Sequence, residues 1–191
     1  LDLPSFKGDL LLVVSGGTYF EPAVGAAITT DGHELTAALV NVGAGFNFEN
    51  VTVTPISHLI TGLAEHYVTA ENQSVAAATN EASEHLNRHF GNLNWLQTVP
   101  TDLTTSESPQ FDESAKAGLI LGALSMQARG IGEAAGLTPG SGINTMVLTT
   151  ALYDDLSFDG FFDGDGSSGQ IRLPPGDATK SYKVDGQTVR L

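Results

Sequence analysis

Five aspartates recur at short intervals late in the chain, with glycines between some of them. The segment reads Asp154-Asp-Leu-Ser-Phe-Asp-Gly-Phe-Phe-Asp-Gly-Asp-Gly166. Ca²⁺ prefers several carboxylate and carbonyl oxygens, held on a loop that glycine allows to bend sharply. We therefore take this acidic loop as the candidate site and Ca²⁺ as its candidate cofactor. The candidate metal ligands are Asp155, Asp159, Asp163 and Asp165.

The acidic loop fits an EF-hand only in part. Counted from Asp159 as position 1, the register places Gly164 at the position where an EF-hand needs glycine. However, Phe161 stands at position 3, and Gln170 stands where the bidentate glutamate belongs. The sequence therefore predicts a looser site and not a regular EF-hand.

The acidic loop also has a simpler interpretation, because Asp-Gly pairs are common in turns. In that interpretation the loop is a solvated turn after a helix. Phe158, Phe161 and Phe162 would then anchor it to the core.

A second candidate for metal chemistry is the series Glu81, His85 and His89, which recurs every four residues. On a helix these side chains share one face, and two histidines at that spacing can chelate a transition metal. Glu84 and Arg88 lie among them, so the segment is also typical of an ordinary charged helix face. No further ligand with clear spacing accompanies the pair.

Catalytic motifs are not found at the required spacing. Ser57 and His58 are neighbours, but adjacent helical residues point about 100° apart and do not form a prearranged dyad. We expect His58 to be an exposed or rim residue. Gly140-Ser-Gly142 lacks the spacing of a nucleophile elbow. These observations favour a non-catalytic protein over an enzyme.

Three aromatic residues, Trp95, Tyr67 and Tyr19, are candidates for a platform on which a polysaccharide could stack. The alternative for Trp95, the only tryptophan, is a plug in the core. The residue types alone leave both interpretations open.

Composition limits the class of partner. The 191 residues carry a formal net charge of −14 and contain no cysteine. Such a charge repels phosphate backbones and anionic lipid surfaces, so nucleic acid is not an expected partner. The absence of cysteine excludes disulfides and thiolate metal sites. Neither a signal peptide nor an apolar run of membrane-spanning length is found, and the chain begins at Leu1, which suggests a processed product or a fragment.

The elements that must position these residues change type at Val51–Leu59. Before this seam, short apolar runs alternate with glycine turns and predict strands; after it, apolar residues recur at helical spacing. The predicted strands are 10–14, 18–20, 23–29, 34–42 and 47–54, with a hairpin turn at Asp31-Gly32. The predicted helices are 55–67, 72–90, about 112–130 and 143–156.

Strands followed by helices predict an α+β fold: a small β-sandwich-like part followed by a helical, bundle-like part. Thr54-Pro55 marks the start of the first helix, because Thr is a good N-cap and Pro suits the first helical position. We expect a β-rich subdomain over residues 1–54, a helical subdomain over 55–166, and a polar tail over 167–191. The tail is predicted to be either a linker or a final hairpin that pairs 181–184 with 188–191.

The seam also carries a family resemblance. The motifs are Val13-Val-Ser-Gly-Gly-Thr-Tyr19 with Glu21 soon after, Val53-Thr-Pro-Ile-Ser-His-Leu59, and the acidic segment from Asp155 to Gly164. Together they resemble a module of large secreted or lipid-anchored bacterial surface proteins of the deltaproteobacterial type, over roughly residues 10 to 170. The resemblance implies an extracellular or cell-surface location.

Two functions follow as expectations. The first is a non-catalytic structural, adhesive or assembly module of an extracellular or cell-surface bacterial protein. Its partners would be neighbouring domains or copies of itself, because a small sheet leaves unpaired edges. The second is an accessory module of a secreted hydrolase, in which the acidic loop binds a metal.

Overall fold

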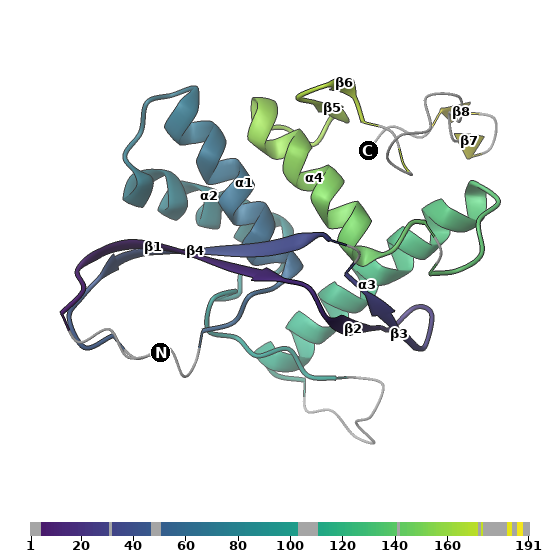
Figure 1. Ribbon diagram of the computed structural model, residues 1–191, viewed down its shortest axis with the longest axis horizontal. Coiled ribbons are helices and arrows are strands. Elements are labelled where there is room, and N and C mark those ends of the chain that lie inside the picture. The colour runs from purple at the N-terminus through teal and green to yellow at the C-terminus, as the bar shows by residue number, and fades with distance from the viewer. Residues whose placement is uncertain are drawn as a thin grey trace. The chain divides into compact units, whose positions relative to one another are not determined.

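The computed structural model describes residues 5–30, 32–46, 51–102, 111–140, 142–171, 173, 183–184 and 187–188. Strands come first and four long helices follow, so the predicted α+β class is confirmed (Figure 1). The strands are β1 Gly8–Ser15, β2 Thr18–Glu21, β3 Ala26–Thr29, β4 Glu34–Val42, β5 Asp165–Gly166, β6 Gly169–Gln170, β7 Lys183–Val184 and β8 Gln187–Thr188. The helices are α1 Pro55–Thr69, α2 Val75–His89, α3 Glu113–Ala134 and α4 Thr145–Asp159.

No helix in the described part of the chain is long and apolar enough to cross a membrane.

The N-terminal strands pair as two separate ribbons. β1 is hydrogen-bonded to β4, and β2 is antiparallel to β3, with Thr18 opposite Thr29 and Glu21 opposite Ala26. β3 and β4 are therefore not a hairpin, and the prediction of a hairpin turn between them is wrong. Gly32 does take the positive φ of 83° that a tight turn needs, while Asp31 lies outside the described residues.

Contacts divide the chain into two compact units. Unit 1 comprises Leu1–Val14 and Leu35–Leu119, and unit 2 comprises Ser15–Glu34 and Ile120–Leu191. These units do not follow the ranges 1–54, 55–166 and 167–191, which were drawn from the change from strand to helix. Those ranges stay a prediction about domains.

Unit 1 is built on the packing of α1 against α2. Their apolar stripes are buried as the helical spacing predicts, except that Val75 is 45% exposed. Val75 is the first residue of α2, directly after the N-cap Ser74, and therefore lies at the helix end. The buried stripe residues are Ile56, Leu59, Ile60, Leu63, Tyr67, Ala78, Ala82 and Leu86.

The start of α1 is held by a reciprocal cap. Thr54 Oγ1 accepts the backbone N–H of Ser57 at 3.2 Å, and Ser57 Oγ accepts the backbone N–H of Thr54 at 2.9 Å. Pro55 occupies the first helical position, where its missing N–H leaves no partner unsatisfied. The predicted helix start is therefore confirmed.

The strand predicted for 47–54 does not form over 51–54, and its first half lies outside the described residues. Thr52 bonds instead to the segment that follows α2. Its N–H donates to Leu96 O at 2.9 Å, and its hydroxyl donates to Trp95 O at 3.0 Å. The hydrogen bonds of Thr52 are therefore made to a loop and not to a neighbouring strand.

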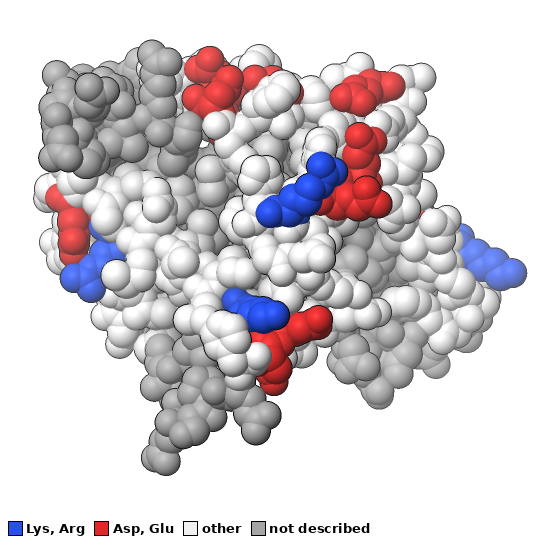
Figure 2. Space-filling model, turned by 180° about the vertical axis from the view of Figure 1, so that it is seen from behind, with Lys and Arg blue, Asp and Glu red and all other residues white. Residues whose placement is uncertain are grey.

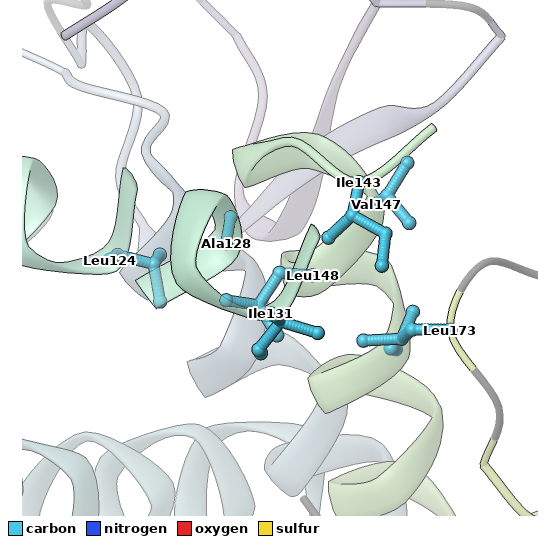
Figure 3. Packing of buried hydrophobic residues seen from close by; sticks show 8 residues of the cluster. Leu124, Ala128, Ile131, Ile143, Val147, Leu148 and Leu173 are labelled. Carbon is cyan, nitrogen blue, oxygen red and sulfur yellow. The ribbon is translucent and has the colours of Figure 1, made fainter. Parts of the chain in front are cut away.

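The core of unit 2 lies between α4 and the C-terminal part of α3 (Figure 3). Small Ala128 on α3 allows close packing beside larger aliphatic side chains. The buried cluster comprises Leu124, Ala128, Ile131, Ile143, Val147, Leu148, Ala151 and Leu173.

The last two long helices extend beyond their predicted ends. Asp112 caps α3 through its carboxylate, which accepts the N–H of Ala115 at 2.9 Å. α3 continues past Gly130 to Ala134. α4 begins at Thr145 after its N-cap Asn144 and continues past Leu156 to Asp159. In the tail, the two-residue strands β7 and β8 pair antiparallel, which agrees with the hairpin alternative.

Candidate functional site

The acidic loop is formed where α4 ends. Gly160 closes α4 in the left-handed conformation, with φ 84°, and its N–H donates to Leu156 O at 3.0 Å. The chain then turns back, and the N–H of Gly164 donates to Asp155 Oδ1 at 3.0 Å. β5 and β6 follow as a short antiparallel pair, with Gly166 opposite Gly169. A Cβ at Gly166 would overlap the carboxylate of Asp154, so a larger residue there would require this side chain to move.

Asp155 is the buried member of the acidic loop. Its side chain is fully buried, and its Oδ2 has no hydrogen-bond partner. Burial, together with a smaller repulsion from Asp163 and Asp159, raises the pKa of Asp155 to about 6, although the hydrogen bond from the Gly164 N–H lowers it. A carboxylate in this place lacks part of the compensation that a buried charge needs.

The other aspartates of the loop make local hydrogen bonds. Asp159 Oδ1 accepts the N–H of Phe161 at 2.9 Å, and Asp163 Oδ1 accepts the N–H of Asp165 at 3.0 Å. Each of these two hydrogen bonds closes a short turn of the kind that aspartate side chains favour. Asp154, which was not among the candidate ligands, accepts the hydroxyl of Ser167 at 2.7 Å.

The four candidate ligands lie in and beside one loop, but their carboxylates do not come together around a common point. Asp163 and Asp165 are exposed, whereas Asp155 is buried. Among the described residues, no group of three or more histidine, cysteine or carboxylate side chains is arranged to hold a metal ion. Binding of Ca²⁺ would therefore need the exposed aspartates to turn toward Asp155.

The phenylalanines of the loop do not anchor it in the way that the turn interpretation expects. Phe158, Phe161 and Phe162 are 53%, 69% and 37% exposed. The loop is fixed instead by its backbone hydrogen bond to Asp155 and by the packing of α4 against β5.

Glu21 forms a second, fully buried acidic site in unit 2. Only 1% of the residue is exposed, yet its carboxylate accepts four hydrogen bonds. The donors are the Tyr19 hydroxyl at 2.7 Å, the Thr145 N–H at 2.9 Å, the Thr145 hydroxyl at 2.6 Å and the Ser125 hydroxyl. A buried carboxylate is tolerated when its oxygens are satisfied in this way.

The position of Glu21 at the start of α4 adds to this stabilisation. Thr145 is the first residue of that helix, where unpaired N–H groups and the helix dipole favour an anion. Beside it, Ser125 Oγ accepts the N–H of Ala23, and Arg129 donates to Ala23 O at 2.8 Å. Glu21 thus joins the β2–β3 hairpin to α3 and α4. The sequence analysis noted Glu21 soon after the Gly-Gly-Thr-Tyr motif, but the sequence gave no sign of these distant partners.

Ser57 and His58 both form hydrogen bonds to one residue of β4. Ser57 Oγ lies 3.0 Å from Thr36 O, and His58 Nδ1 accepts the N–H of Thr36 at 3.1 Å. His58 is only 6% exposed, so the expectation of a rim residue is wrong. Burial lowers its pKa to about 4, and the ring is neutral at physiological pH.

The α2 residues proposed as metal ligands have other partners. His85 Nδ1 lies 2.5 Å from the Tyr67 hydroxyl, and Glu81 accepts the amide of Gln73 at 2.8 Å. Burial raises the pKa of Tyr67, and the charges of Glu81 and Glu71 raise it further, so Tyr67 stays protonated and its hydroxyl is available to His85. This face is a hydrogen-bonded helix surface.

The three aromatic residues do not form an open platform. Trp95 is 2% exposed and Tyr67 is 6% exposed, so neither ring offers a free face at the surface. Tyr19 belongs to unit 2, where its hydroxyl bonds to Glu21. The core-plug alternative is therefore the correct one for Trp95.

Comparison with family models, curated proteins and solved structures found no match to this chain.

Proposed function

We propose that the chain is a non-catalytic structural, adhesive or assembly module of an extracellular or cell-surface bacterial protein. The observation that carries the proposal is the exposure of β1. Leu11, Val13 and Val14 are 56%, 50% and 51% exposed, on a strand whose described partner is β4 alone. Apolar strands with one partner are unusual on the surface of an isolated protein.

The chemistry of β1 supports assembly by strand addition. An edge strand presents a row of N–H and C=O groups that another strand can pair with, and its side chains then supply apolar contact. The occupant that we propose is a strand from a neighbouring domain or from another copy. The absence of cysteine and the net charge of −14 support an extracellular location.

The variant Val13→Lys tests this proposal. A lysine on an edge strand opposes pairing without disturbing the core, because Val13 is half exposed. We expect association, measured by sedimentation velocity over a concentration series, to be lost in this variant. Ala27→Lys, on an exposed position of β3, is the matched control and should associate like the wild type. Equal behaviour of both variants, or a wild type that is monomeric in the presence of its neighbouring domains, would overturn the proposal.

A second candidate function is an accessory module of a secreted hydrolase in which the acidic loop binds Ca²⁺. The buried Oδ2 of Asp155 has no hydrogen-bond partner. This observation favours the second function, because a bound cation would give that oxygen a partner. Asp159 and Asp163 lie near enough to raise the pKa of Asp155, so the same cation could neutralise all three carboxylates.

Isothermal titration with Ca²⁺ tests this second candidate. We expect saturable binding that weakens in Asp159→Asn and Asp163→Asn, while Glu84→Gln, which removes one charge from α2, has no effect. Binding should also weaken below about pH 6, because protons compete for Asp155. Absence of heat and of any melting shift at millimolar Ca²⁺ would rule the site out.

Without a cation, Asp155 should give the loop a distinct pH dependence. Its folded-state pKa of about 6 lies above the ordinary value of 3.8, so its contribution to stability is present below about pH 3.8 and lost as the pH rises through about 6. Saturating Ca²⁺ should remove this loss.

A further inference from the structure

The middle of α3 is apolar on its outer face as well as on its core face. A surface helix usually packs an apolar stripe on the core and presents charged or polar residues on the opposite side. α3 buries Leu124 and Ala128 in the core of unit 2. Yet residues 117–128 contain no charged residue, and only Ser125 and Gln127 among them carry polar side chains. Large apolar side chains are therefore left at the surface of this helix.

Four exposed residues form a stripe along the outer face of α3. They are Leu119, Ala123, Met126 and Gly130, which follow one another at intervals of three or four residues and so share one side of the helix. Leu119 is 47% exposed and Met126 is 57% exposed. α3 runs unbroken from Glu113 to Ala134, so the periodicity of this one helix aligns the four residues. We call them the α3 stripe.

The sizes of the stripe residues suit a second copy of the same helix. Leu119 and Gly130 lie at equal distances from the midpoint of the stripe. Ala123 and Met126 also lie at equal distances from that midpoint. In an antiparallel pair of α3 helices with a two-fold axis at the midpoint, each large side chain lies opposite a small residue of the other copy. A parallel pair would instead place the two Leu119 side chains against each other.

The charges at the two ends of the α3 stripe agree with an antiparallel pair. Lys116 precedes the stripe by one turn and Glu133 follows it by one turn, and both are exposed. In the antiparallel pair, Lys116 of one copy lies level with Glu133 of the other. Glu133 Oε1 already accepts a hydrogen bond from Arg129 at 2.7 Å, and its carboxylate can accept more than one donor. An exposed ion pair contributes little energy, so these charges select the orientation.

We propose that α3 pairs with α3 of a second copy, in antiparallel orientation, through the α3 stripe. Four side chains bury far less than the roughly 1,200–2,000 Å² of a stable interface. The pairing therefore rests on the proposed function, because strand addition at β1 holds two copies together and raises their effective concentration. The α3 contact then fixes the orientation of the copies within the assembly.

Single cysteines test the pairing without background, because the chain contains no cysteine. Ala123→Cys lies close to the two-fold midpoint, where the two introduced thiols come within reach of a disulfide. Lys116→Cys places its two thiols about 25 Å apart along the helices, at a rise of about 1.5 Å per residue. We expect disulfide-linked dimers of Ala123→Cys under oxidising conditions and none of Lys116→Cys. Equal linkage of both variants, or no linkage of Ala123→Cys, overturns the proposal.

Met126→Glu and Gln127→Glu are the matched variants, each made together with Ala123→Cys. Both positions are exposed on α3 and both changes add one negative charge, but only Met126 belongs to the α3 stripe. Met126→Glu should weaken the pairing about tenfold, measured from the yield of linked dimer over a concentration series, because it places a charge in an apolar contact. Gln127→Glu should leave the yield unchanged. Equal yields of the two variants contradict the assignment.

Val13→Lys separates the α3 pairing from strand addition. Made together with Ala123→Cys, it should abolish the disulfide-linked dimer, because the copies are then no longer held at β1. If sedimentation shows association but Ala123→Cys forms no linked dimer, the α3 pairing is wrong and strand addition stands. If the linked dimer survives Val13→Lys, the α3 pairing stands and strand addition between copies is wrong.

Discussion

Glu21 shows how one side chain can join segments that are distant in the sequence. Its four donors come from β2, α3 and the start of α4, and together they leave the carboxylate satisfied while buried. His58 has a comparable role in unit 1, where it links α1 to β4. At the scale of residues, polar side chains therefore supply much of the specificity of each unit's core.

The substitution Glu21→Gln should destabilise unit 2. It replaces one accepting oxygen by a donating amide, which faces donors from Thr145 and Ser125 and leaves at least one of them unpaired. We expect the free energy of unfolding to fall by about 2 kcal/mol, measured by urea denaturation. Glu34→Gln, at an exposed position of β4, should change it little. Equal stability of the two variants would show that the buried carboxylate is not needed.

His58 should make the protein less stable in acid. Its pKa is near 6.5 when unfolded and about 4 when folded, so its contribution is present above pH 6.5 and is lost as the pH falls toward 4. The loss amounts to at most about 3 kcal/mol. Comparing unfolding curves of wild type and His58→Gln across this window measures it, with the exposed His89→Gln as control. If the stability of His58→Gln falls with pH as steeply as that of the wild type, another group causes the effect.

At the scale of elements, the helices were predictable from sequence and the strand pairing was not. Thr54, Pro55 and the stripe from Ile56 to Tyr67 are local signals that act over a few residues, so they fixed the first helix. The pairing of β1 with β4 skips a whole hairpin, and neighbouring residues carry no mark of such a partner.

The same distinction applies to the candidate sites. The acidic loop was visible because its aspartates are close in sequence. The surroundings of Trp95 were not, because they come from α1, α2 and the loop after them, and the sequence left both the plug and the platform interpretation of Trp95 open. The burial of His58 was missed because it depends on β4, more than twenty residues earlier, which covers the start of α1.

Thr54→Ala should weaken the start of α1. Its side chain satisfies the N–H of Ser57, and only 4% of the residue is exposed, so removal should lower the free energy of unfolding by about 1 kcal/mol. Thr69→Ala, at the exposed end of the same helix, removes a hydroxyl that donates to Glu65 O and serves as the control. Thermal melts of the two variants give the comparison, and a smaller shift for Thr54→Ala than for the control would refute the cap.

At the scale of the whole molecule, charge dominates. Figure 2 shows acidic side chains in several separate groups on one face, with Lys or Arg side chains beside some of them. A net charge of −14 opposes close approach of two copies, although the exposed apolar residues of β1 favour it. The balance between these effects should depend on ionic strength.

We therefore expect self-association to increase with salt. Screening shortens the range of the repulsion to about 8 Å at physiological ionic strength, while apolar contact is unaffected. Sedimentation velocity in NaCl and in CaCl₂ at matched ionic strength separates screening from specific binding. A stronger effect of CaCl₂ would support a cation site, and a strict monomer in both salts would contradict strand addition between copies.

The chain passes from unit 1 into unit 2 twice, and this order affects how the protein folds during its synthesis. The hairpin that carries Glu21 leaves the ribosome well before Ser125 and Thr145, which lie 104 and 124 residues later. At ordinary rates of translation this interval is on the order of ten seconds. During that time the carboxylate must stay hydrated and the hairpin must wait, so unit 2 can close only when nearly all of the described chain has been made. Unit 1 needs nothing beyond Leu119 and can form first, which makes the order of folding a result of the order of synthesis.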